Sequence, residues 1–237
     1  MSLLRVENVT KRFGGITANQ DVSFSVEAGQ IVGLIGPNGA GKTTMFNCIA
    51  GFAPPTAGAI WLDNLMISGF SPEQCARAGI GRTFQVARTF TSMSALENVM
   101  VGAFLIDRNV SAARRAAGEL LDFVNLGKFK NKAAGSMTIS EQRRLAVARA
   151  LAVHPKLLLM DEVMAGLNPT EVRETVDVVL KIRDRGISCL IVEHVLEGIM
   201  PIADAIVVLD YGKKIADGKP ADVSNNPQVI AAYLGEE

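Results

Sequence analysis

Short apolar runs alternate along the chain with longer stretches in which apolar residues recur every three or four positions. The short runs are typical of buried strands, and the longer recurrence is typical of helices. Strands are predicted over residues 3–9, 22–26, 30–35, 59–62, 82–85, 157–160, 187–192 and 205–209. Their alternation with helices predicts an α/β fold with a mostly parallel sheet. The early strands alternate in polarity and lie close together, which predicts a small antiparallel β layer at the N-terminus.

The middle third of the chain lacks a strand pattern. Helices are predicted over residues 95–105, 111–124, 141–152 and 170–185. Three of these helices lie between the strands that end at residue 85 and begin at residue 157. We therefore expect a helical lobe, residues 86–152, inserted into a core formed by residues 1–85 and 153–237. Because no linker separates the two parts, both should belong to a single domain.

The composition fits a globular protein that does not enter a membrane itself. Hydrophobic residues make up 49% of the 237 positions and charged residues 20%, which is unlike an intrinsically disordered chain. The 24 Lys and Arg residues balance the 24 Asp and Glu residues, so we expect no nucleic-acid partner. The longest apolar runs are far shorter than the roughly 18 residues that cross a bilayer, and the N-terminus lacks a signal-peptide pattern. We expect a cytoplasmic protein that reaches a membrane only through a partner.

One glycine-rich segment has the form of a phosphate-binding loop. Residues 36–43 fit the pattern G-x-x-x-x-G-K-[ST], after a predicted strand and before a helix, which is the setting that the pattern requires. Glycines let backbone N–H groups wrap around phosphate, and the helix adds its positive end. Lys42 would reach the outer phosphates of ATP, and the Thr43 hydroxyl would ligate Mg²⁺. The predicted nucleotide-binding residues are Gly36, Pro37, Asn38, Gly39, Ala40, Gly41, Lys42, Thr43 and Thr44.

Three further polar residues follow apolar strands and should meet this loop. Asp161 and Glu162 end the strand over residues 157–160, which places both at the carboxyl edge of the sheet, where open α/β folds bind ligands. Asp161 would hold Mg²⁺, and Glu162 would accept a proton from the attacking water, a role worth ~10²–10⁴-fold in rate. His194 follows the next strand and could donate a hydrogen bond to the terminal phosphate or the water. Solvated acids and a structural histidine are the alternative, and the phosphate loop favours the catalytic interpretation.

The order of these motifs resembles the ATP-binding cassette (ABC) family over almost the whole chain. The resemblance implies that this is a P-loop NTPase core that binds and hydrolyses ATP with Mg²⁺. It implies that Phe13 stacks on adenine, and that Gln85 touches the metal and links the core to the helical lobe. It also implies that residues 165–168 cross to an opposing cassette, and that His194 is the switch histidine.

One motif of that family is altered here. The family's signature, usually Leu-Ser-Gly-Gly-Gln, aligns with residues 137–141, which read Met-Thr-Ile-Ser-Glu. By resemblance, Thr138 and Ser140 would contact the nucleotide of the opposing cassette. Thr138 keeps a hydroxyl and can cap a helix, whereas Ile139 adds a branched side chain where phosphate should approach closely. A second departure is Val163, where the family usually has proline, and the sequence offers no mechanistic explanation for it.

More narrowly, residues 81–85, 96–102 and 165–169 resemble an ATP-binding subunit of branched-chain amino acid importers. This resemblance implies integral-membrane permease subunits as partners, and a place on the inner face of the cell membrane through that permease. It also implies a second ABC ATPase subunit, and the altered signature favours a heterodimer over a homodimer. Other possibilities are an exporter subunit, a soluble cassette acting on ribosomes or DNA, and a small-molecule kinase. A kinase would leave Gln85, the signature segment and His194 without a shared explanation.

We also expect the permease to dock in the cleft between the core and the helical lobe, lined by Gln85 to Met93. The segment from Gln85 to Met93 is the covalent entry into the helical lobe from the phosphate site. Its apolar residues Val86, Phe90 and Met93 could supply contact area for a partner. The alternative is ordinary packing beneath a loop.

Overall fold

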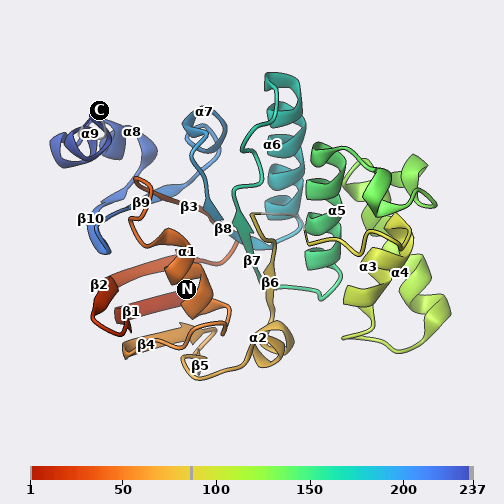
Figure 1. Ribbon diagram of the computed structural model, residues 1–237, viewed down its shortest axis with the longest axis horizontal. Helices are drawn as coiled ribbons and strands as arrows, with labels where there is room; N and C mark the ends of the chain where they lie inside the picture. The colour runs from red at the N-terminus through yellow and green to blue at the C-terminus, as the bar shows by residue number, and fades with distance from the viewer. Residues whose placement is uncertain (1, 86–87, 235–237) are drawn as a thin grey trace.

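Two sheets organise the molecule, whose computed structural model describes residues 2–85 and 88–234 (Figure 1). The larger sheet has the order β10-β9-β3-β8-β7-β6. Its strands are β3 (Ile31–Ile35), β6 (Ile80–Arg82), β7 (Leu157–Asp161), β8 (Ser188–Val192), β9 (Ala205–Asp210) and β10 (Lys213–Gly218). All neighbours in it are parallel except β9 and β10.

The smaller sheet is antiparallel, with the order β2-β1-β4-β5. It consists of β1 (Ser2–Phe13), β2 (Ile16–Glu27), β4 (Ala57–Leu62) and β5 (Leu65–Met66). The predicted α/β fold, with a mostly parallel sheet and an antiparallel layer near the N-terminus, is confirmed.

The central strands are buried on both faces. Every residue of β3, β7 and β8 is buried, which is why their sequences are almost continuously apolar. Alternate residues enter different cores: Ile31 and Ile35 belong to one hydrophobic cluster, whereas Val32 and Leu34 belong to the other. The second cluster lies between the two sheets and includes Phe46 of helix α1 (Lys42–Ile49). The strand ends that carry polar residues are thus held by cores on both sides.

The four longer helices lie where the sequence predicts them. They are α3 (Ala95–Ala103), α4 (Val110–Phe123), α5 (Ile139–Leu151) and α6 (Pro169–Asp184). The residues that precede α3, α5 and α6 are Ser94, Thr138 and Asn168, and each forms a reciprocal capping box with the third residue of its helix. These boxes satisfy backbone N–H groups of the first turn. Figure 1 shows α3 and α4 at the end of the molecule opposite the antiparallel sheet, with α5 between them and β7. The division into a lobe of residues 86–152 and a core remains a prediction.

The structure differs from the predicted elements at several places. The strand predicted over residues 82–85 is wrong: β6 covers Ile80–Arg82 and ends where that prediction begins. Gly81 lies within β6, where a side chain would collide with the backbone of α5. Because glycine has no side chain, it adds no apolar position to the pattern from which strands are predicted. The short or polar elements were not predicted: β5, β10, α2 (Pro72–Ala78), α7 (Leu196–Ile199), α8 (Pro220–Ser224), α9 (Pro227–Leu234), and the 3₁₀ turns η1 (Gly127–Phe129) and η2 (Ala134–Ser136). Of the helices in the described ranges, none combines the length and the apolar character that a bilayer span requires.

A buried amide shapes the loop that precedes α3. Asn98, on α3, is fully buried. Its oxygen accepts from the Phe90 N–H at 2.8 Å, and its nitrogen donates to the carbonyls of Phe90 and Ser94 at 3.0 and 2.9 Å. A third bond reaches the Met93 carbonyl at 3.3 Å. One side chain therefore fixes the turn that presents Phe90.

Replacing Asn98 by alanine should destabilise the protein by about 1–3 kcal/mol, because buried backbone groups lose their hydrogen-bond partner. Urea unfolding measured by circular dichroism checks this. Asn225→Ala is the matched control, since Asn225 donates one exposed bond to the Ala221 carbonyl and its loss should cost no more than about 0.5 kcal/mol. Equal midpoints for the two variants would contradict the structural role of Asn98.

Candidate functional site

The phosphate loop joins β3 to α1 and requires its glycines. Gly36, Gly39 and Gly41 have φ of 144°, 76° and 97°, a region that side chains disfavour. A side chain at Gly36 would collide with the Leu209 carbonyl, and one at Gly41 would collide with Ala18 and Asn19. The loop is therefore held close to β2 and β9, with its backbone at the N-terminus of α1, which suits an anion.

Lys42 folds back over this loop. Its side chain is buried, and Nζ donates to the carbonyl oxygens of Gly36 at 2.6 Å and Pro37 at 2.7 Å. An ammonium held by carbonyl oxygens can exchange them for phosphate oxygens without moving far. Thr43 is exposed and Thr44 half-buried, so the Thr43 hydroxyl is accessible to a metal ion.

Asp161 is the last residue of β7, and its carboxylate is buried. It is only 3% exposed, and Oδ2 lies 3.6 Å from a guanidinium nitrogen of Arg82. Burial raises the pKa of Asp161, and Arg82 opposes that rise. Oδ1 is buried without a hydrogen-bond partner among the described residues. A buried oxygen of this kind fits a position in the shell of Mg²⁺, which proteins usually hold with one or two carboxylates together with substrate phosphates.

Glu162 carries the contacts that join the site together. Its backbone has φ of 50°, a left-handed conformation that costs of order 1–3 kcal/mol. The backbone N–H donates to the Val192 carbonyl at 2.8 Å. Gln85 Nε2 donates to Oε2 at 2.7 Å, and His194 Nε2 lies 2.9 Å from Oε1. The Glu162 carboxylate therefore joins two side chains, those of Gln85 and His194, that lie far apart in the sequence.

Glu193 is a site residue that the sequence analysis missed. It is fully buried, and its Oε1 accepts from the Met164 N–H at 2.6 Å. Burial raises its pKa to about 7, although bonds from the backbone N–H groups of Met164, Val195 and His194 oppose the rise. Glu193 therefore ties the loop after Glu162 to the backbone of the histidine. A carboxylate directly before a predicted catalytic histidine was the feature that could have revealed it.

The remaining predicted residues lie apart from this cluster. Phe13, at the end of β1, is 51% exposed, with Lys11 Nζ 4.8 Å from its ring centre. Thr138 caps α5 by accepting from the Glu141 N–H at 3.2 Å. In Figure 1, strands of the large sheet lie between α1 and α5. Within the described residues, the hydrogen bonds of Thr138 stay within its own capping box and the first turn at the start of α5.

The altered signature segment has one exposed and one buried position. Ile139, the first residue of α5, is 69% exposed, whereas Ser140 is only 5% exposed. The Ser140 side chain is therefore inaccessible to a nucleotide of an opposing cassette. A contact from Ser140 would have to come from its backbone N–H. Val163, the other departure, is 3% exposed and packs in the core.

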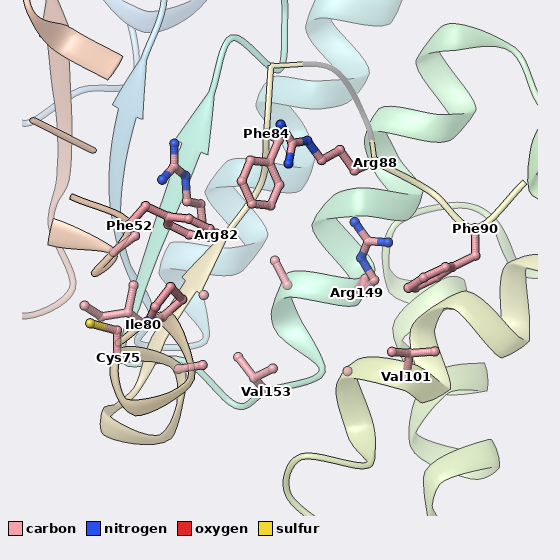
Figure 2. Close-up of a pocket in the computed structure, with 16 residues that line it drawn as sticks. Phe52, Cys75, Ile80, Arg82, Phe84, Arg88, Phe90, Val101, Arg149 and Val153 are labelled. Atoms are coloured by element: carbon pink, nitrogen blue, oxygen red, sulfur yellow. The ribbon is translucent and has the colours of Figure 1, made fainter. Parts of the chain in front are cut away.

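A hollow of about 430 Å³ is lined by residues of α2, β6, α3 and α5. We call it the lobe cleft; Figure 2 shows its lining residues, which include Phe52, Arg82, Phe84, Arg88, Phe90 and Arg149. Of the apolar residues expected in such a cleft, Phe90 lines it, Met93 does not, and Val86 lies outside the described residues. The cleft thus combines aromatic surface with three arginines.

Across residues 2–85 and 88–234, no group of three His, Cys, Asp or Glu side chains is placed to hold a metal ion. The predicted Mg²⁺ ligands Thr43, Gln85 and Asp161 include one carboxylate, and proteins usually hold Mg²⁺ with one or two carboxylates together with substrate phosphates.

Comparisons with known proteins agree with this geometry. Residues 19–165 match the family described as ABC transporter, and residues 213–237 match the family described as branched-chain amino acid ATP-binding cassette transporter. The chain is 42% identical to the high-affinity branched-chain amino acid transport ATP-binding protein BraF of Pseudomonas aeruginosa, covering 99% of this chain and 98% of BraF.

Two solved structures show the same fold. The ADP conformation of MJ1267, an ATP-binding cassette of an ABC transporter, has a TM-score of 0.91 and 31% identity, with full coverage of both chains. The dimeric post-hydrolysis state of the cassette MJ0796, bound to ADP and phosphate, has a TM-score of 0.83 and 27% identity, covering 92% of this chain and 98% of that one. Because the family match, the near full-length relative and the fold coincide with a formed phosphate loop, this chain belongs to the ABC transporter family and is an ATP-binding, ATP-hydrolysing cassette of it.

Proposed function

We propose that this chain is the ATP-hydrolysing subunit of an importer for branched-chain or other hydrophobic amino acids. The observation that carries the hydrolytic role is the Glu162 carboxylate, held by Gln85 and His194 one residue after the buried Asp161. The cargo class is supported by the similarity to BraF, a branched-chain amino acid transport protein. The chain would sit on the inner face of the cell membrane, attached through permease subunits.

Each residue of the site has a role in hydrolysis under this proposal. Lys42 and the loop backbone hold the phosphates, and Phe13 packs on adenine. Thr43, Gln85 and Asp161 would hold Mg²⁺, which neutralises charge on the phosphates. Glu162 takes a proton from water as the water oxygen bonds to the terminal phosphorus and the bond to ADP breaks. His194 keeps Glu162 oriented and donates to the phosphate that leaves.

The competing functions are an exporter subunit and a soluble cassette acting on ribosomes or DNA. All would share the same hydrolytic site, so ATPase measurements do not separate them. Purification of the chain from membranes with its bound permease, followed by uptake of labelled leucine into vesicles, does separate them. Release of leucine without uptake would favour export, and purification without any membrane protein would favour the soluble alternative.

Glu162→Gln should leave ATP binding intact and lower turnover by about 10²–10⁴-fold, because the amide keeps the shape but accepts no proton. Steady-state phosphate release, with nucleotide affinity measured by a fluorescent ATP analogue, checks both parts. A variant that hydrolyses at most of the wild-type rate would reject Glu162 as the base.

The lobe cleft is the proposed docking site for the permease. It offers exposed aromatic surface, since Phe52 and Phe90 are 50% and 46% exposed. Arg82, Arg88 and Arg149 add positive charge, with Arg88 and Arg149 placed over the rings of Phe84 and Phe90 at 5.0 and 5.6 Å. Aromatic and arginine side chains that gather in one hollow are typical of residues that dominate binding energy. An apolar segment of the permease would fill it.

Phe90→Asp should release the subunit from membranes while leaving its melting temperature close to that of wild type. Leu65→Asp is the control, because Leu65 is similarly exposed, at 49%, but lies on the antiparallel sheet. Copurification with the permease after detergent extraction reports the outcome. If both variants stay attached, or if Phe90→Asp unfolds the protein, the cleft is not the docking site that we propose.

The altered signature supports a heterodimer. Cassettes of this family place each ATP between the phosphate loop of one chain and the signature of the other. Here the phosphate loop, Asp161, Glu162 and His194 are complete, whereas Ile139 presents an exposed branched side chain at the start of α5. A partner with an intact signature would complete the site built on Lys42. A homodimer would place Ile139 in both sites.

We therefore expect low ATPase activity for the isolated protein, higher activity in a heteromeric complex, and a gain when Ile139→Gly/Ser140→Gly restores close backbone approach to phosphate. Val110→Gly is the matched control, because Val110 is likewise an exposed first residue of a helix, α4. ATPase rates of the three proteins, alone and with the partner cassette, decide the matter. Equal rates in both settings would show that the altered signature does not limit hydrolysis.

A further inference from the structure

Arg82 lies between the lobe cleft and the site of hydrolysis. It ends β6 and lines the cleft, yet its side chain is only 8% exposed. Figure 2 shows the guanidinium among the aromatic rings at the core side of this hollow. One charged side chain is therefore in contact with two regions to which we assign different tasks.

On the side of the hydrolytic site, Arg82 makes two polar contacts. One guanidinium nitrogen lies 3.6 Å from Asp161 Oδ2. A second guanidinium nitrogen donates to Asn47 Oδ1 at 2.8 Å, and Asn47 belongs to α1, the helix that follows the phosphate loop. Arg82 thus holds one oxygen of the proposed magnesium carboxylate and leaves the other, Oδ1, without a partner among the described residues.

On the side of the cleft, aromatic rings pack around the same guanidinium. Its central carbon lies 5.1 Å from the ring centre of Phe52 and 5.0 Å from that of Phe84. These two rings meet edge to face, with centres 5.7 Å apart. Phe52 is half exposed, so a segment that fills the cleft would press on rings that support Arg82.

We propose that Arg82 is a positioning residue that couples occupancy of the lobe cleft to the orientation of the Asp161 carboxylate, and so to metal binding. The coupling rests on the proposed docking of the permease in that cleft. A planar guanidinium is suited to the task because it can pack against rings with its faces while its edge binds Asp161 and Asn47, which the ammonium of lysine cannot do. Partners that orient metal ligands in this way typically contribute 10–100-fold to metal affinity.

The experiment measures metal binding directly, with Mn²⁺ as the probe and Glu162→Gln as the background, so that ATP stays intact. Electron paramagnetic resonance counts free Mn²⁺ in the presence of ATP, for the subunit alone and for the copurified permease complex. Arg82→Lys is compared with Arg144→Lys. Arg144 is the matched control, since it is 15% exposed and pairs with Glu174 at 3.2 Å, away from Asp161.

Arg82→Lys should raise the dissociation constant of Mn²⁺ about tenfold or more relative to the Glu162→Gln protein that keeps Arg82. In the protein that keeps Arg82, binding of the permease should change this dissociation constant, and in Arg82→Lys it should not. Arg144→Lys should match the Glu162→Gln protein. Asn47→Ala removes the second anchor of Arg82 and should produce a smaller shift in the same direction, which keeps the test available if Arg82→Lys does not fold.

Two results would overturn the inference separately from the docking proposal. In the first, Arg82→Lys and Asn47→Ala bind Mn²⁺ as tightly as the Glu162→Gln protein without them, while Phe90→Asp still releases the permease. The docking site then stands, and the coupling through Arg82 fails. If the permease remains bound to Phe90→Asp, docking lies elsewhere, and the coupling fails with it. Copurification and Mn²⁺ binding are independent readouts, so the two failures are distinguishable.

Discussion

The rest of the site depends on one carboxylate, that of Glu162, and on the two side chains that hold it. Gln85 and His194 reach it from positions 77 and 32 residues away in the sequence. They can do so because β6, β7 and β8 are parallel neighbours, so that the segments leaving them emerge at one edge of the sheet. A break in that parallel order would separate the three residues, whatever their individual conformations.

Around this carboxylate the chain buries charge, and each buried group has a compensating contact. Lys42 is held by two carbonyls of its own loop, Asp161 by Arg82, and Glu193 by backbone N–H groups. Removing an ion from water is costly unless partners replace the lost hydration. The remaining desolvation cost is offset when a ligand of opposite charge binds, as phosphate would at Lys42 and a metal ion would at Asp161 Oδ1.

The sequence predicted the parts of this site that follow a strict local pattern. A phosphate loop must join a strand to a helix, so the pattern alone locates residues 36–43, and Asp161, Glu162 and His194 follow from strands of unambiguous apolar character. Arg82 could not be found in this way, because its importance comes from burial and from contacts across the fold. Glu193 stands directly before the predicted His194, but its burial and its backbone contacts come from the fold. The start of β6 was misplaced for a related reason: Gly81 pairs in the sheet but contributes no apolar side chain to the pattern. The lobe cleft likewise depends on the tertiary fold, since Phe52 and Phe90 are brought together only by the packing of distant elements.

The central claim is that nucleotide binds on the phosphate loop with its terminal phosphate directed toward Glu162. The most direct test is an experimental structure of the Glu162→Gln variant with Mg²⁺ and ATP. The account predicts that Lys42 Nζ has left the carbonyls of Gly36 and Pro37 for phosphate oxygens, that Asp161 Oδ1 lies in the metal shell, and that Phe13 packs on adenine. Lys42 still bound to those two carbonyls, with the nucleotide seated elsewhere on the chain, would contradict it.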